Sequence, residues 1–75
     1  MAQMYQLTAM LRAVYLDGEK IGGIREIPEG AVLTVIGDAP VPGLTEVVYE
    51  GDRYALFYDD LVYRAKKTWA VAVGA

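Results

Sequence analysis

The chain has 75 residues, the size of a single domain, and its 7 basic and 10 acidic side chains give a net charge of −3 at pH 7. Cysteine, histidine and serine are all absent, so the composition excludes disulfides, the usual structural zinc sites and catalysis by Ser-His-Asp or Cys-His groups. The one basic cluster, Arg64, Lys66 and Lys67, is too small to supply the phosphate contacts of a nucleic-acid-binding protein. We therefore expect no catalytic residue, no cofactor and no nucleic-acid partner.

The hydrophobic content of 55% is high for a small domain. The longest uncharged run, residues 1–11, is too short to span a bilayer. No basic segment precedes an apolar one at the N-terminus, as a signal peptide would require. We expect a cytoplasmic protein with no membrane partner. Because so few residues carry so much apolar surface, we also expect part of it to bury against another chain in a homo-oligomer.

Residues 8–16 (TAMLRAVYL) fit either a helix or a strand. Thr8 could cap a helix, and the Ala, Met, Leu and Arg residues that follow favour helical structure. Apolar side chains also alternate along the segment, as they do in a strand; these are Leu7, Ala9, Leu11, Ala13 and Tyr15. We favour the strand, because the segment is short and its surroundings are β.

Three groups of turn residues divide the next part of the chain. Residues 16–23 (LDGEKIGG) carry three glycines and two acidic side chains between apolar runs and predict a loop or a loose hairpin. Residues 27–30 (IPEG) fit a type I turn with Pro28 at its second position. The β-branched residues 31–37 (AVLTVIG) predict the clearest strand. Residues 37–43 (GDAPVPG), with two prolines and two glycines, cannot continue it.

Residues 44–50 (LTEVVYE) and 53–58 (RYALFY) predict the two strands of a hairpin. The loop between them is either residues 51–52 or residues 50–52. The longer loop places three apolar residues on one face, namely Val47, Ala55 and Phe57. We favour it, because the shorter loop turns Glu46 to the same side as Phe57.

The hairpin runs directly into Asp59 and Asp60. We expect one of these carboxylates to cap a short helical turn near residues 59–62. The alternative is a site for a hard cation, formed together with Asp17, Glu19 or Asp52. We favour capping, because no metal-ligand spacing recurs in the chain, and we predict no metal site.

The tyrosines around the hairpin can cover the interior with their hydroxyls in water, or they can form an outward aromatic surface that contacts a partner. For Tyr49 and Tyr63 we favour coverage. Tyr54 and Tyr58 are equally consistent with both roles, and both are candidate partner-binding residues.

Residues 66–75 (KKTWAVAVGA) predict an apolar strand extension. Trp69, Val71 and Val73 alternate with small or polar residues, the period of a strand whose two sides are largely apolar. Left exposed, such a strand would be an edge strand that can pair with another chain and cause aggregation. It could pack on its own domain beside residues 1–7 or pair with another subunit. We favour the subunit, because a domain this small has little core to offer, and we predict that these three residues bind the partner.

Three stretches, "LRAVYLDG", "IREIPEGAVLTVIG" and "LTEVVYEGDRYALFYDDLVYRA", give residues 11–65 an order of elements that resembles the Src-homology-3-like barrel. That fold has a first strand, a long loop, a glycine-containing turn before a β-branched strand, and a tight hairpin followed by a helical turn. Tyr15 is similar to the first-strand tyrosine of the members that bind proline-rich peptides. Their other groove residues are replaced here by Leu44 and Thr45 (tryptophan), Tyr58 (proline) and Leu61 (tyrosine). The resemblance therefore implies a bacterial domain of this kind rather than a binder of PxxP peptides.

The type II dihydrofolate reductases are similar small barrels, and they supply the enzymatic alternative. These enzymes are homotetramers with an active site at a symmetric pore, and their signature is Val-Gln-Ile-Tyr on a late strand. Residues 55–58 read Ala-Leu-Phe-Tyr here, so Tyr58 matches but Leu56 cannot supply the amide. We favour a non-catalytic protein-protein interaction module that self-associates.

Together, these patterns predict an all-β domain over residues 1–75. We expect a small five-stranded Src-homology-3-like barrel with a helical turn near residues 59–62 and an apolar extension at residues 66–75. The partner is expected to be a second copy or another protein. The expected core includes Ala13, Val32, Val35, Val47, Phe57, Leu61 and Val62.

Overall fold

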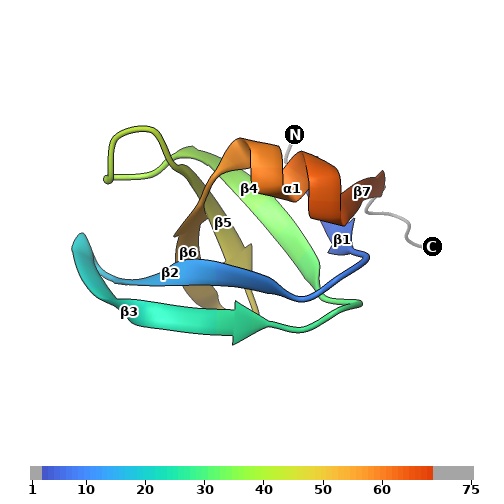
Figure 1. The fold of residues 1–75 in the computed structure, drawn as a ribbon. Coiled ribbons are helices and arrows are strands. Elements are labelled where there is room, and N and C mark those ends of the chain that lie inside the picture. Colours follow the sequence, from blue (N-terminus) through green and yellow to red (C-terminus); the bar gives the residue numbers. More distant parts are fainter. Residues whose placement is uncertain (1–2, 69–75) are drawn as a thin grey trace.

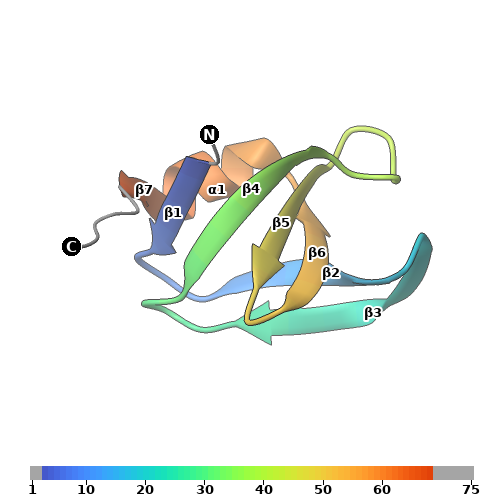
Figure 2. The same ribbon diagram turned by 180° about the vertical axis from the view of Figure 1, so that it is seen from behind.

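The computed structural model describes residues 3–68, and within them the chain forms seven strands and one short helix. In chain order the elements are β1 (Gln3–Leu7), β2 (Leu11–Asp17), β3 (Lys20–Ile27), β4 (Val32–Asp38), β5 (Thr45–Tyr49), β6 (Asp52–Leu56), α1 (Tyr58–Arg64) and β7 (Ala65–Thr68). All paired strands are antiparallel, and the order across the sheet is β3-β2-β6-β5-β4-β1-β7. Figures 1 and 2 show this arrangement from opposite sides.

The predicted all-β class is confirmed, but the predicted five-stranded barrel is wrong. The described residues form one open sheet of seven strands, with β3 at one edge and β7 at the other. The loop or loose hairpin predicted for residues 16–23 is a hairpin, and its second strand, β3, runs through Gly22 and Gly23. The β2–β3 ladder accommodates this glycine pair by a register shift at Tyr15 and Leu16, and a bulge of this kind lets a strand continue past an extra residue.

The ambiguous segment at residues 8–16 is a strand from Leu11 onward, so the prediction of a strand rather than a helix is confirmed. The chain bends before it, and the N–H of Thr8 donates to the carbonyl of Arg64 at 2.8 Å. Leu11 and Ala13 are both 3% exposed and point to the interior. The alternation predicted for this segment therefore holds within β2.

The turn before β4 covers residues 28–31, one residue later than predicted. The N–H of Ala31 donates to the carbonyl of Pro28 at 3.2 Å. Gly30 is the third residue of this turn and has a φ of +90°, as a type II turn requires. The N–H of Gly30 also donates to the carbonyl of Leu7 at 2.9 Å, so the turn is joined to the end of β1.

The β5–β6 hairpin has a two-residue loop, Glu50 and Gly51, so neither predicted register is correct. Both loop residues have positive φ, 51° and 84°, the arrangement of a type I′ turn, which suits the twist of paired strands. Val47 therefore lies opposite Tyr54 on the core face. Glu46 lies on the other face of the sheet, because successive side chains of a strand alternate.

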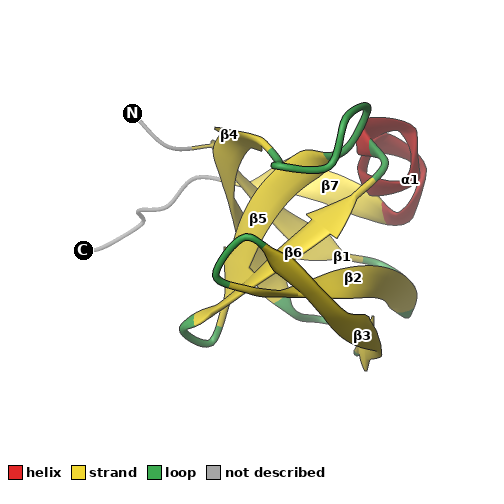
Figure 3. Cartoon of the chain, turned by 90° about the vertical axis from the view of Figure 1, so that its left-hand side faces the viewer, coloured by secondary structure: helices red, strands yellow, loops and turns green. Residues whose placement is uncertain are grey.

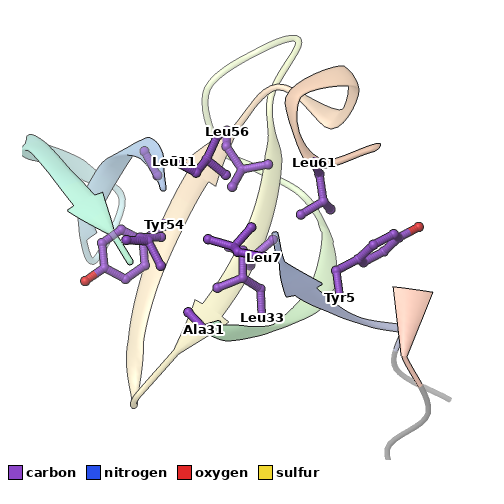
Figure 4. Packing of buried hydrophobic residues seen from close by; sticks show 11 residues of the cluster. Tyr5, Leu7, Leu11, Ala31, Leu33, Tyr54, Leu56 and Leu61 are labelled. Atoms are coloured by element: carbon purple, nitrogen blue, oxygen red, sulfur yellow. The ribbon is translucent and has the colours of Figure 1, made fainter. Parts of the chain in front are cut away.

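The sheet curls around one hydrophobic core, and α1 lies across one end of it (Figure 3). In the close view, Leu7 and Leu33 lie in the middle of the core, and Tyr5 and Tyr54 lie at opposite ends (Figure 4). The buried cluster consists of Tyr5, Leu7, Leu11, Ala13, Ile27, Ala31, Leu33, Val47, Tyr54, Leu56 and Leu61.

Four of the seven predicted core residues are buried in this cluster or packed against it: Ala13, Val35, Val47 and Leu61. The other three are between 40% and 61% exposed: Val32, Val62 and Phe57. β4 begins at Val32, so strand alternation turns Leu33 and Val35 inward instead. Phe57 follows the end of β6 and lies on the outer side of the sheet.

The predicted helical turn is confirmed and extends over seven residues as α1, but the predicted capping by Asp59 or Asp60 is wrong. Phe57 is the N-cap residue, and no side chain forms a capping hydrogen bond. Asp59 and Asp60 lie in the first turn and Arg64 in the last, positions where their charges are favourable to the helix dipole. Leu61 is fully buried and points from α1 into the core (Figure 4). In residues 3–68, no helix is both long and apolar enough to cross a membrane.

β7 pairs with β1, so the first residues of the predicted apolar extension belong to this chain's own sheet. Thr68 lies opposite Met4, and Ala65 lies opposite Leu7. The predicted partner-binding residues Trp69, Val71 and Val73 lie outside the described residues, and their role stays a prediction.

Candidate functional site

The outer face of the sheet carries an apolar groove of about 210 Å³, which we call the outer groove. It lies between the β2–β3 hairpin, the loop that joins β4 to β5, and the start of α1. Its lining residues are Arg12, Ala13, Val14, Ile24, Leu44, Ala55, Leu56, Phe57 and Asp60. Only two of these nine residues are charged, so the groove suits an apolar group.

The floor of the outer groove is formed by residues that lie directly opposite one another on neighbouring strands. Val14 pairs with Ile24 of β3 on one side and with Ala55 of β6 on the other. Ala55 in turn pairs with Glu46 of β5. Directly opposed residues of a sheet share a face, so strand pairing alone brings the groove's floor residues together.

The walls of the outer groove are large hydrophobic side chains that remain in contact with water. Ile24 is 71% exposed and Phe57 is 61% exposed. Leu44 is fixed at the end of the loop between β4 and β5 by two backbone hydrogen bonds: its carbonyl accepts from Ala39 N–H at 3.0 Å, and its N–H donates to the carbonyl of Val41 at 3.2 Å. The groove therefore has a floor of paired strands and exposed apolar walls that a partner could cover.

A second hollow of about 280 Å³ adjoins the outer groove, and we call it the arginine hollow. It is lined by Met10, Leu11, Arg12, Asp60 and Arg64, and it shares Arg12 and Asp60 with the outer groove. Arg12 forms an exposed ion pair with Glu26 at 3.6 Å. With two guanidinium groups and one carboxylate among its five lining residues, the hollow is more polar than the groove.

Glu46, the residue opposite Ala55, carries a buried carboxylate whose charge is neutralised by a partner. Glu46 is only 6% exposed, and the Nε of Arg53 donates to its carboxylate. This carboxylate raises the pKa of Arg53 through their hydrogen bond. The pair keeps Glu46 from being a buried carboxylate without a partner, which would be costly.

The structure does not present Tyr54 at the surface, so an outward contact role for this residue is wrong. Tyr54 is 5% exposed and belongs to the core. Its ring packs edge-on against Tyr15, with 5.8 Å between the centroids. The guanidinium of Arg25 lies 3.8 Å from the centroid of Tyr15, a favourable cation–π distance. Tyr15, likened to a groove tyrosine of the peptide-binding domains, does not line the outer groove.

Tyr58 is 46% exposed and stays a candidate contact residue. Its hydroxyl lies 3.1 Å from the hydroxyl of Tyr5, and either can be the donor. This hydrogen bond and the burial of Tyr5 both raise the pKa of the Tyr5 hydroxyl. Of the other two tyrosines, Tyr49 is half-buried, and this burial raises the pKa of its hydroxyl. Tyr63 is 85% exposed, so the prediction that it covers the core is wrong.

The sequence did not single out the residues that form the groove walls. Ile24 follows the glycine-rich stretch that predicted a loop or loose hairpin, and Leu44, which follows a proline-rich loop, was noted only where the peptide-binding domains have a groove tryptophan. The available signal was two isolated large hydrophobic residues beside turns, a weak indication of a site. In the described part of the chain, no group of three or more acidic residues is placed to hold a metal ion.

Comparison of this chain with protein-family models, with curated proteins and with solved structures finds no match in any of the three.

Proposed function

We propose that the protein is a non-catalytic interaction module that associates with a second copy of itself through the outer groove. The observation that carries the proposal is that two highly exposed hydrophobic side chains, Ile24 and Phe57, line the same groove. A partner that covers them removes apolar surface from water, which is the main favourable term in association. Exposed apolar grooves of this kind mark interaction sites.

The composition supports a second copy as the partner. More than half of the residues are hydrophobic, and nine large hydrophobic side chains are exposed within residues 3–68. Most soluble oligomers are symmetric assemblies of identical chains, so a second copy is a natural partner for such surface.

We also propose a kinship with the Src-homology-3-like proteins. The support is the order of elements: the β2–β3 hairpin, the loop between β4 and β5, the tight β5–β6 hairpin, and α1 directly after it. The additional strands β1 and β7 distinguish this chain from the five-stranded form. Fold kinship by itself assigns no function.

The test of self-association is the molar mass in solution, measured by size-exclusion chromatography with light scattering at micromolar concentrations. We expect a multiple of the 8.2 kDa chain mass, and we expect Ile24→Lys to lower it toward a single chain. The matched control is Ile36→Lys, because Ile36 is 57% exposed but does not line the groove. A single-chain mass at every concentration overturns the proposal. Oxidation of NADPH in the presence of dihydrofolate would overturn its non-catalytic part.

A further inference from the structure

We infer that residues 69–73 of a second copy are the group that occupies the outer groove. This inference rests on the proposed self-association and names the segment that mediates it. Residues 69–75 (WAVAVGA) contain no charged side chain. Their large side chains, Trp69, Val71 and Val73, match the apolar walls of the groove in chemistry.

The volume of the groove fits a small number of such side chains. A space of about 210 Å³ lies below the range of about 300–1,000 Å³ found for small-molecule sites, so it suits a few side chains rather than a whole ligand. Side chains two residues apart on an extended segment point the same way. Two of the three large side chains can therefore enter the groove together while the backbone remains outside.

The position of Thr68 favours a second copy over the chain's own groove. Thr68 ends β7 at one edge of the sheet, whereas Val14 and Ile24 of the groove lie on β2 and β3 near the other edge. β7 adjoins the C-terminal end of α1 (Figure 1). The groove adjoins the N-terminal end of α1, because Phe57 and Asp60 line it. A segment that leaves Thr68 would have to turn back along α1 to reach its own groove, whereas the groove of another molecule can meet it without such a turn.

Charge complementarity agrees with this placement. Lys66 and Lys67 lie immediately before the segment, and both are exposed. Asp59 and Asp60 lie in the first turn of α1, directly after the groove residue Phe57. If the segment enters the groove from the side of α1, one of these lysines approaches the acidic first turn of the helix, beside Arg12 of the groove lining. Such surface pairs steer association and weaken with added salt.

Trp69 is the one tryptophan of the chain, so its fluorescence reports directly on the segment. We expect the Trp69 emission of the full-length protein to shift to shorter wavelength as protein concentration rises, because the indole leaves water. Ile24→Lys should move the midpoint of this shift to a concentration at least about tenfold higher, equivalent to about 1.4 kcal/mol. Phe57→Lys is a second groove variant, and Ile36→Lys, outside the groove, should leave the midpoint unchanged.

A mixing experiment identifies the contact as one between two copies. Val71→Asp disables the segment and leaves the groove intact, whereas Ile24→Lys disables the groove and leaves the segment intact. We expect each variant alone to be a single chain by light scattering and their equimolar mixture to contain complexes of two chains. A synthetic peptide of residues 68–75 should bind the Val71→Asp variant and should not bind it when Ile24→Lys is added. Circular dichroism of each variant confirms that the sheet is kept.

The outcomes separate this inference from the proposed function. If Val71→Asp keeps the oligomer while Ile24→Lys loses it, the groove mediates self-association but residues 69–73 do not occupy it. If the Trp69 emission responds to Ile24→Lys but not to protein concentration, the segment occupies the groove of its own chain, and the inference that it enters a second copy is wrong. If the wild type is a single chain at all concentrations, self-association itself fails.

Discussion

The ring of Tyr15 occupies the space that a side chain at position 22 would need. A Cβ built on Gly22 lies 2.6 Å from Cδ2 of Tyr15, closer than non-bonded carbon atoms approach. The ring cannot move away freely, because Arg25 covers one face and Tyr54 packs against it. Gly22 is therefore required by the packing of the β2–β3 hairpin.

The first prediction is that Gly22→Ala lowers the free energy of unfolding by about 1–3 kcal/mol, the usual cost of overpacking. The measurement is urea denaturation followed by circular dichroism. In a Tyr15→Ala background the added methyl group has room, so the same substitution should cost less, and the two effects should be non-additive. Equal costs in the two backgrounds would show that the contact with Tyr15 is not the cause.

The second prediction concerns alkaline pH. The pKa of Tyr5 is raised above 10.0 in the folded state, so the neutral hydroxyl favours folding. Its contribution is complete below about pH 10, the unfolded value, and is lost as the pH rises through the folded value. In Tyr5→Phe, the decline of unfolding free energy above about pH 10 should be shallower than in the wild type. Tyr63→Phe is the exposed control and should follow the wild type. Parallel curves for wild type and Tyr5→Phe would contradict the prediction.

The third prediction concerns the buried carboxylate of Glu46. Arg53→Met removes its partner and should lower the free energy of unfolding by about 1–3 kcal/mol, the cost of an unsatisfied buried group. Arg12→Met is the matched control, since the Arg12–Glu26 pair is exposed on both sides, and it should change stability by less than about 0.5 kcal/mol. Thermal denaturation of both variants at neutral pH gives the comparison, and similar losses in the two would refute the assignment.

The fourth prediction tests how α1 is held to the sheet. Leu61→Ala should lower the free energy of unfolding by about 2–5 kcal/mol, because it leaves a cavity under the helix. Val62 is the next residue and is 50% exposed, so Val62→Ala should cost less than about 0.5 kcal/mol. Chemical denaturation distinguishes the two. A larger loss for Val62→Ala would mean that the other face of α1 packs on the sheet.

The sequence predicted the β class, the hairpin around residue 51 and the helix after it, because each has a local signal in turn residues or alternation. The register of that hairpin could not be predicted in the same way. It requires Glu50 to adopt a positive φ, which glutamate does not favour. The sequence also disfavours a register that turns Glu46 to the side of Phe57. In the structure the carboxylate of Glu46 has a partner, Arg53, on the adjacent strand.

The site was harder to predict than the fold, because its residues meet only through tertiary structure. The glycine pair before Ile24 predicts a loop or a loose hairpin, since the sequence does not show that the ring of Tyr15 requires Gly22 within a strand. Val14, Ile24 and Ala55 come from three strands whose order depends on long-range pairing. The resemblance to peptide-binding domains drew attention to Tyr15, which lies on the core side instead.

The placement of β1 between β4 and β7 has a consequence for how the chain folds. β1 finds its partners in residues 32–35 and 65–68, so its two ladders close long loops, whereas the β2–β3, β4–β5 and β5–β6 hairpins are local. Loop closure costs entropy that local pairing avoids. β1 therefore gains partners on both of its sides only after residues 65–68 are in place, later than the strands of the local hairpins.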